Sequence, residues 1–254
     1  MRVLAIARNT FREAVRDRVV HLLFVFSLVL IAGSRVLSPL ALGEGEKIVK
    51  DLGLSLIGLF GVLLVVFIGS SLVHKEVDRR TIDILLSKPI RRWEFLVGKF
   101  AGMTATLGAV TALMLAALLA LLAMTGAGPS GGIVVAGLLV VVELALLTAV
   151  ALLFSTFTTP TLAAVFTLSV YITGHLSADL LDFARAVPNT ANRVVSQVLY
   201  CALPNLEMLN VRSEVVHGLP VAPERLAAAL AYAALYTAFL LGLGSVILSR
   251  RDFR

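Results

Sequence analysis

Long apolar runs separated by short polar segments dominate the pattern along the chain. A helix that crosses a bilayer needs roughly 20 mostly apolar residues to cover a hydrocarbon core of about 30 Å. Five runs meet this length well, and a sixth is marginal. We therefore predict an all-α integral membrane protein with six transmembrane helices in a single membrane-embedded domain, 1–254. The predicted spans are 19–38, 52–73, 100–125, 133–157, 161–178 and 226–249.

The apolar stretch 133–178 allows either one very long helix or two. It is interrupted by the polar run Ser155-Thr-Phe-Thr-Thr-Pro160. Proline lacks a backbone donor and disrupts a helix interior, and the polar cluster breaks the apolar pattern. The interruption favours two helices, and six spans place both termini on one side of the membrane.

The N-terminal residues 1–18 have the periodicity of an amphipathic helix. Apolar positions that include Phe11 fall on one face, whereas Arg8, Arg12 and Arg16 recur every fourth residue on the other. Such a helix is expected to lie in the membrane interface with its basic residues toward anionic lipid headgroups. A simple basic anchor for the first span explains the pattern equally well and gives the same location.

Charge is concentrated outside the predicted spans. The chain is 59% hydrophobic and 15% charged, whereas a soluble domain is about 45–50% apolar and about 25% charged. Most of the 22 Lys and Arg residues lie before the first span, between the second and third spans, and after the last. Because cytoplasmic loops carry the excess of Lys and Arg, both termini are predicted to be cytoplasmic in the plasma (inner) membrane. The net charge of +6 is then a topology signal and does not indicate nucleic-acid binding.

Two polar regions connect the predicted spans on opposite sides of the membrane. Region 74–99, which interleaves basic and acidic residues, is predicted to be cytoplasmic. Region 177–225 is predicted to be external and holds four prolines. Within it, 191–202 has apolar residues at helical spacing, which suggests a short helix on the outer leaflet or a lid over a cavity.

The motifs of common enzymes are absent from the sequence. It contains no G-x-x-x-x-G-K-[ST] phosphate-binding loop, no H-E-x-x-H, no paired-cysteine metal spacing and no G-x-S-x-G. The four histidines are scattered, and Cys201 is the single cysteine. We expect no catalytic residues, no metal site and no cofactor, and any ATP that drives the protein must bind a separate subunit.

Five short segments resemble the permease subunits of type-2 ABC transporters. The resemblance is in particular to the branch that includes the permease of the copper-site maturation transporter for nitrous oxide reductase. The segments extend from one end of the chain to the other, and the second is the most specific. They are 9–18 (NTFREAVRDR), 76–89 (EVDRRTIDILLSKP), 92–99 (RWEFLVGK), 203–210 (LPNLEMLN) and 250–253 (RRDF).

This resemblance implies a homodimer, or a pair with a similar permease, associated with ATP-hydrolysing subunits. It also implies that a coupling helix between the second and third spans docks on the ATPase. The residues agree, because this otherwise charged segment has an apolar edge that needs a partner; a solvated loop in contact only with the chain itself is the alternative. Trp93 is expected to anchor the third span at the membrane interface. The predicted ATPase-coupling residues are Glu76, Arg79, Arg80, Ile82, Leu85, Leu86 and Pro89.

Glu143 lies near the middle of the fourth predicted span. A charge at that depth costs roughly 2.5–3.5 kcal/mol on insertion scales, so the side chain should face protein or a water-filled path, or be protonated. A functional role on the transport path and a structural hydrogen bond to a Ser or Thr of a neighbouring span are equally compatible with the sequence.

The sequence as a whole favours an ABC transporter permease subunit that couples hydrolysis by a separate ATPase to substrate movement, with export as the expected direction. A non-transporting membrane scaffold or regulatory subunit that recruits a cytoplasmic protein is the alternative. A secondary transporter is less favoured, because the two halves show no repeat and only Glu143 lies deep in a span.

Overall fold

The computed structural model describes residues 2–37, 44–70, 91–124, 131–177 and 203–250. Within these ranges every regular element is a helix, in agreement with the predicted all-α class. The α-helices are α1 (Arg2–Val15), α2 (Arg18–Leu37), α3 (Gly45–Leu64), α6 (Arg92–Met124), α7 (Gly131–Ser155), α8 (Pro160–His175), α11 (Arg212–Val216) and α12 (Pro223–Arg250). A π-helical turn, η2 (Val65–Gly69), continues α3, and a 3₁₀ turn, η3 (Glu207–Leu209), precedes α11.

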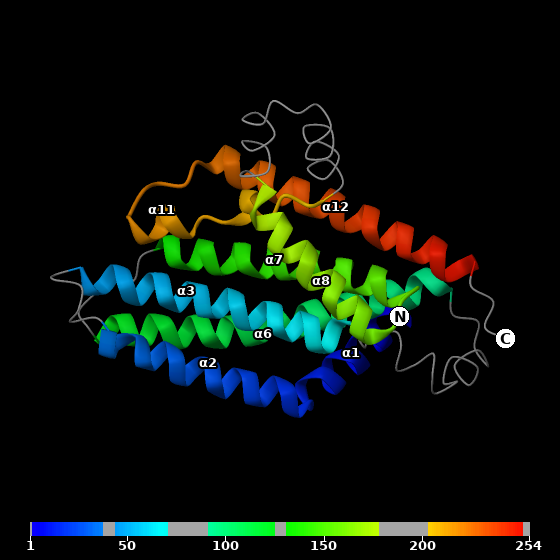
Figure 1. Cartoon of the computed structure of the whole chain (residues 1–254), viewed down its shortest axis with the longest axis horizontal. Coiled ribbons are helices and arrows are strands. Elements are labelled where there is room, and N and C mark those ends of the chain that lie inside the picture. The colour runs from blue at the N-terminus through cyan, green and yellow to red at the C-terminus, as the bar shows by residue number, and fades with distance from the viewer. Residues whose placement is uncertain (1, 38–43, 71–90, 125–130, 178–202, 251–254) are drawn as a thin grey trace.

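The long helices form an elongated bundle. Helices α2, α3, α6 and α7 run side by side, α12 lies along α7, and α8 crosses the bundle obliquely (Figure 1). Helix α7 is central, because it packs against α3, α6, α8 and α12. Its residues are buried along most of its length, and they include the polar side chains of Glu143, Thr148 and Ser155.

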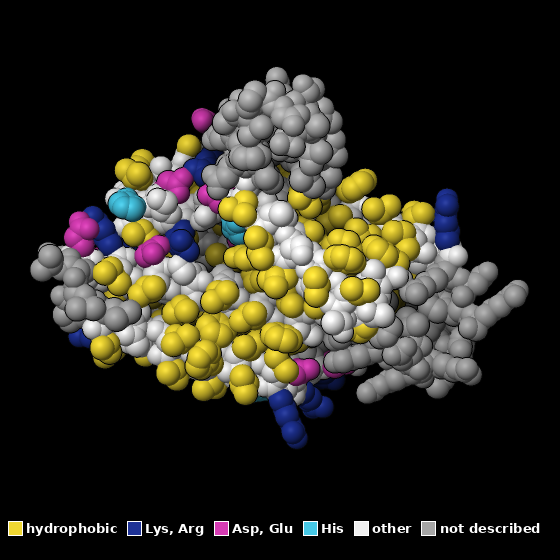
Figure 2. Space-filling view, viewed as in Figure 1, with side chains coloured by type: hydrophobic (Ala, Val, Ile, Leu, Met, Phe, Trp, Pro, Cys, Tyr) yellow, Lys and Arg dark blue, Asp and Glu magenta, His cyan; other side chains and the backbone are white. Residues whose placement is uncertain are grey.

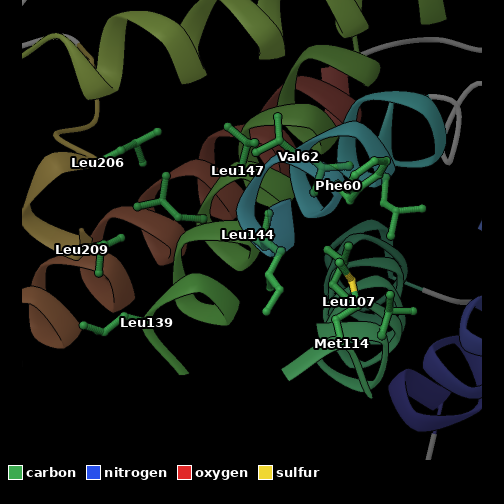
Figure 3. Packing of buried hydrophobic residues seen from close by; sticks show 14 of the residues in the cluster. Phe60, Val62, Leu107, Met114, Leu139, Leu144, Leu147, Leu206 and Leu209 are labelled. Atoms are coloured by element: carbon green, nitrogen blue, oxygen red, sulfur yellow. The ribbon is translucent and has the colours of Figure 1, made fainter. Parts of the chain in front are cut away.

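Glycines allow the central helices to approach each other closely. A Cβ atom at Gly53 or Gly61 of α3 would clash with Leu118 of α6 or Leu144 of α7, respectively. Small residues at helix contacts are typical of membrane bundles, in which packing rather than the hydrophobic effect drives helix association. The core that results includes side chains of α3, α6 and α7 together with Leu206 and Leu209 around η3 (Figure 3).

Five of the described helices are long and apolar enough to cross a membrane: α2, α3 with η2, α6, α7 and α12. Hydrophobic side chains cover much of the length of one face of the bundle, while charged ones gather toward its ends (Figure 2). Helix α8 has only 16 residues, about 24 Å at 1.5 Å per residue, and does not reach this length. The protein is therefore a multi-pass membrane protein, and a sixth span remains a prediction.

The division of 133–178 into two helices is confirmed. Helix α7 ends at Ser155, and α8 begins at Pro160. Pro160 is the first helical residue of α8, where its missing N–H has no intrahelical partner to lose. The hydroxyls of Thr156 and Thr158 donate hydrogen bonds to the carbonyls of Leu153 and Phe154 at the end of α7. The polar run thus ends one helix and Pro160 starts the next.

Helix α1 packs directly on the first turns of α6. A Cβ atom at Gly102 of α6 would lie 2.5 Å from the carbonyl oxygen of Ala7 and 2.6 Å from Cβ of Thr10. Next to this contact Lys99 is buried, with its Nζ atom 4.0 Å from Oε2 of Glu13 and 5.8 Å from the centre of the Phe95 ring. The apolar side of α1 therefore rests on protein, which the sequence did not indicate.

The two ends of the bundle bring together different parts of the chain. At one end the guanidinium of Arg92, in the first turn of α6, donates to the carbonyl oxygen of Leu248 near the end of α12, close to where α1 docks (Figure 1). At the other end Arg212 of α11 donates to Ser55 of α3 over 2.6 Å. The start of α6 and the end of α12 thus lie together, opposite α11.

Candidate functional site

Glu143 lies at the midpoint of α7, where the bundle is otherwise apolar. The residue is 8% exposed, and its neighbours Leu144, Leu146 and Leu147 are buried in the core. Leaving a carboxylate without a partner in such surroundings is costly. In this structure Glu143 faces protein, which was one of the three alternatives expected for it.

The partner of Glu143 is His175, the last residue of α8. Its Nε2 atom lies 2.8 Å from Oε1 of Glu143. The two meet because α8 begins beside the end of α7 and stops after 16 residues, so its final turn reaches only the middle of α7. Tyr171, one turn earlier, packs its ring edge-on against the imidazole with the ring centres 4.7 Å apart.

Glu207, in the η3 turn, approaches the other side of the imidazole. Nδ1 of His175 lies 3.4 Å from Oε2 of Glu207. The side-chain amide of Asn210 donates to both carboxylate oxygens of Glu207 at 3.3 Å. The exposed fractions of the side chains are 10% for Glu143, 25% for His175 and 43% for Glu207. We call Glu143, His175 and Glu207 the acid–histidine cluster; it extends from the buried centre of α7 to a more exposed position.

Segment 203–211 is held at this depth by contacts with both neighbouring helices. The backbone N–H of Leu206 donates to the carbonyl oxygen of Gly174 over 3.2 Å. A Cβ atom at Gly174 would lie 2.8 Å from the carbonyl oxygen of Pro204, so only glycine permits this approach. On the α12 side, the N–H of Asn205 donates to the hydroxyl of Tyr232 over 2.8 Å.

A second set of charged residues secures the segment at the end of the bundle. Nε of Arg212 lies 3.0 Å from Oδ1 of Asp51 on α3. Arg225, at the start of α12, pairs with Glu214 and also donates from Nη2 to the carbonyl oxygen of Asn210 over 3.3 Å. We call Asp51, Arg212, Glu214 and Arg225 the outer clasp. Asn210 connects the outer clasp to the acid–histidine cluster.

The environment of Glu214 in the outer clasp lowers the pKa of its carboxyl group below 4.5. Partial burial raises the pKa, but hydrogen bonds from the residue's own backbone N–H and from Arg225, with the charge of Arg225, lower it by more. Glu214 therefore stays ionised and paired at neutral pH.

The acid–histidine cluster can bind or move protons, since it contains two carboxylates and an imidazole in hydrogen-bonding series. Its geometry does not suit a metal ion, because the two imidazole nitrogens face different carboxylates. In the described part of the chain, no three His, Cys, Asp or Glu residues are grouped so that they could hold a metal ion.

The other predicted site residues are distributed as follows. Arg8 and Arg12 on α1 and Arg16 in the turn after it are exposed, and Phe11 is half-buried. Trp93, at the start of α6, is 46% exposed. Their contact with lipid stays a prediction. The coupling residues Glu76, Arg79, Arg80, Ile82, Leu85, Leu86 and Pro89, and the external stretch 191–202, lie outside the described residues.

The sequence identified Glu143 but not its partners. A Ser or Thr was one expected partner, whereas the structure places His175 there. His175 lies near the end of a marginal apolar run, and nothing local marks it as different from the other histidines. Glu207 and Asn210 do fall in the motif 203–210 that carried the family resemblance, which was the one available signal.

Comparisons with known proteins give one family. The model of the family described as "ABC-2 family transporter protein" matches residues 4–253. A search of curated proteins found no match.

Proposed function

The chain belongs to the ABC-2 family of transporter proteins, and from this premise we propose that it couples ATP hydrolysis by a separate subunit to the movement of a substrate across the membrane. The observation that carries the proposal is the family match over nearly the whole of this multi-pass chain. The family implies an ATP-binding partner, and the sequence contains no phosphate-binding loop of its own. A scaffold or a secondary transporter has no comparable support.

We place the end of the bundle with α1, the start of α6 and the end of α12 in the cytoplasm. Basic residues recur there, among them Arg8 and Arg12 on α1 and Arg16 just after it, and cytoplasmic segments carry the excess of Lys and Arg. Region 74–99 leads into the same end, since α6 starts at Arg92. The outer clasp and α11 would then face the outside, and the membrane would be the plasma (inner) membrane.

The transport path is proposed to pass the acid–histidine cluster. Its polar side chains lie halfway along α7, at a depth where ionisable groups typically serve transport or proton movement. Segment 203–211 contributes Glu207 to the cluster and leads into α11 on the proposed outer side, so its displacement would open the site outward. Export is the direction we propose, with two copies of the chain forming the complete path in a homodimer. The motifs 9–18, 203–210 and 250–253 further support the branch of the copper-maturation permease.

Coupling is proposed to run through region 74–99 into α6. The apolar edge formed by Ile82, Leu85 and Leu86 would dock on the ATPase, with Glu76, Arg79 and Arg80 around it and Pro89 ending the helix. From Arg92 onward α6 contacts both α1 and α12, and the Arg92–Leu248 hydrogen bond ties it to α12. A movement of the docked region would therefore act on three helices at once.

The test of this proposal is the double substitution Leu85→Ala/Leu86→Ala in the complete complex. It should reduce both co-purification of the ATPase subunit and transport in reconstituted vesicles, because truncating a well-packed interface anchor typically costs about 2 kcal/mol or more. Arg79→Glu/Arg80→Glu should instead slow assembly and make it more sensitive to salt. Leu219→Ala, at an exposed leucine near the opposite end, is the control. Unchanged co-purification and transport in the leucine variant would favour the scaffold.

A further inference from the structure

We propose that the acid–histidine cluster is a proton-binding site. Compared with one neutral imidazole and two ionised carboxylates, it holds one additional proton. This shared proton keeps Glu207 against His175, and its loss releases Glu207 and loosens segment 203–211. The ligand is a proton exchanged with the outer solution, and its binding is a property of this chain alone.

The arrangement of the three side chains favours the extra proton. A neutral imidazole has one N–H donor and one bare nitrogen, and an ionised carboxylate can only accept. In the structure Nε2 of His175 contacts Glu143 at 2.8 Å and Nδ1 contacts Glu207 at 3.4 Å. One N–H can serve only one of them, so the other carboxylate would face a lone pair. An imidazolium, or one protonated carboxyl group, removes this conflict.

Burial determines which contact breaks when the proton leaves. The Glu143 side chain is 10% exposed and forms the shorter contact, whereas that of Glu207 is 43% exposed. An unpaired carboxylate costs more in the buried position. The remaining N–H should therefore stay with Glu143, while Glu207 turns toward solvent.

The other groups around His175 do not titrate in the range of an imidazole. Tyr171 contributes its ring from α8, and a tyrosine ordinarily ionises near pH 10. Asn210, which donates to Glu207, is neutral. Tyr232 of α12 contacts the backbone of Asn205, Arg212 is paired with Asp51 at the outer end, and η2, also packed against α8, contains no titratable side chain. A transition between about pH 5 and 8 would thus report the cluster.

Releasing Glu207 has a structural consequence for segment 203–211. Glu207 lies in the turn between Leu206 and Leu209, two leucines that reach the central core (Figure 3). Without its contact the segment keeps the Leu206–Gly174 and Asn205–Tyr232 hydrogen bonds and its buried leucines, but it loses the side-chain link between η3 and α8. Any effect on transport rests on the proposed function: the segment would be an outer closure that opens more readily when the cluster is deprotonated.

The experiment is hydrogen exchange of peptides within 203–211, with the full chain in lipid nanodiscs and no ATPase. Protection factors corrected for intrinsic exchange should fall about tenfold between acidic and alkaline solution, the factor expected for the loss of one charge-assisted hydrogen bond. His175→Gln and Glu207→Gln should each remove this pH dependence. The control His217→Gln, whose wild-type Nδ1 faces the Ser213 carbonyl oxygen at 2.8 Å and is exposed, should retain it.

A second measurement observes the proton directly. In protein with ¹⁵N-labelled histidine rings, the signal missing from His175→Gln identifies His175, and infrared spectra report protonated carboxyl groups. At acidic pH we expect either a doubly protonated ring or a carboxyl band that Glu143→Gln or Glu207→Gln removes. The proposal is wrong if neither signal appears, or if the wild type is equally protected at both pH values. It is also wrong if both His175→Gln and Glu207→Gln retain the pH dependence. Because no ATPase is present, these outcomes are independent of whether the chain transports anything.

Discussion

Glu143 can occupy the middle of α7 because α8 ends at the same depth and supplies a histidine. The cost of a mid-membrane carboxylate is roughly 2.5–3.5 kcal/mol on insertion scales, which is offset when the group is hydrogen-bonded within protein. His175 provides that bond, and Glu207 with Asn210 extends it toward the end of the bundle that holds α11. The cluster is therefore a unit, and changing one member alters the surroundings of the others.

Substitutions at Glu143 should separate the need for a hydrogen bond from the need for a charge. Glu143→Gln retains an acceptor for Nε2 of His175, so we expect a fall of only about 1 kcal/mol in the free energy of unfolding. Glu143→Lys places a cation against His175 and should cost roughly 3–5 kcal/mol, as when one member of a buried pair is removed. Thermal unfolding of the purified chain in nanodiscs measures both.

The control for this series is Glu224→Lys, at an exposed glutamate in the first turn of α12. It should change stability by less than about 1 kcal/mol. If Glu143→Lys is expressed at the wild-type level and is as stable as the wild type, the position is open to water. Loss of transport by Glu143→Gln in an intact complex would support its proposed place on the path.

At the scale of elements, the contact between α1 and α6 depends on two glycines one turn apart. A Cβ atom at Gly98 would lie 2.7 Å from Cβ of Ile6, and one at Gly102 would lie 2.5 Å from the backbone oxygen of Ala7. The second obstacle is backbone and cannot rotate away. Helix α1 is therefore built into the bundle beside the start of α6, where we propose that coupling enters.

Gly102→Ala should displace α1 and destabilise the chain by about 1–3 kcal/mol, the usual cost of overpacking. Trypsin cleavage at Arg8 and Arg12 in nanodiscs should become faster, since both residues lie on α1. The matched control is Gly242→Ala on α12, where an added Cβ meets nothing within 4 Å. Equal cleavage rates for Gly102→Ala and the wild type would show that α1 does not need this contact.

Helix α11 should lose stability in acid because of the outer clasp. The folded-state pKa of Glu214 is lowered below 4.5, so its contribution is fully present above the ordinary carboxyl pKa and is lost as the pH falls through the lowered value. The pair with Arg225 is partly exposed, so we expect at most about 1 kcal/mol.

Corrected hydrogen-exchange protection of 212–219 at neutral and acidic pH measures this loss. Arg225→Gln should reduce the acid sensitivity, whereas Arg8→Gln, an exposed position on α1, should not. Identical acid sensitivity in wild type and Arg225→Gln would contradict the assigned role of the pair.

At the scale of the molecule, the sequence could indicate the spans but not how they meet. Length and hydropathy suffice for five long helices, and Pro160 with the preceding threonines suffices for the break between α7 and α8, because these are local properties. Contacts between segments distant in the sequence have no local signal. His175 meets Glu143 because α8 is short and crosses α7, and α1 rests on α6 because of Gly98 and Gly102. A rare buried carboxylate could thus be located, while its histidine could not.

The orientation of the whole bundle is open to a direct test. From the excess of Lys and Arg we predict that α1 lies in the cytoplasm, which would put the start of α3 outside. In a Cys201→Ser background, a membrane-impermeant maleimide on right-side-out vesicles should label Glu44→Cys and spare Arg8→Cys. The two positions suit the test because the Glu44 side chain is 66% exposed and Arg8 is exposed. Inverted vesicles should give the opposite result. Labelling of Arg8→Cys alone from outside would show that the topology is the reverse of the predicted one. The more exposed side of the acid–histidine cluster would then face the ATPase, and its proton would come from the cytoplasm.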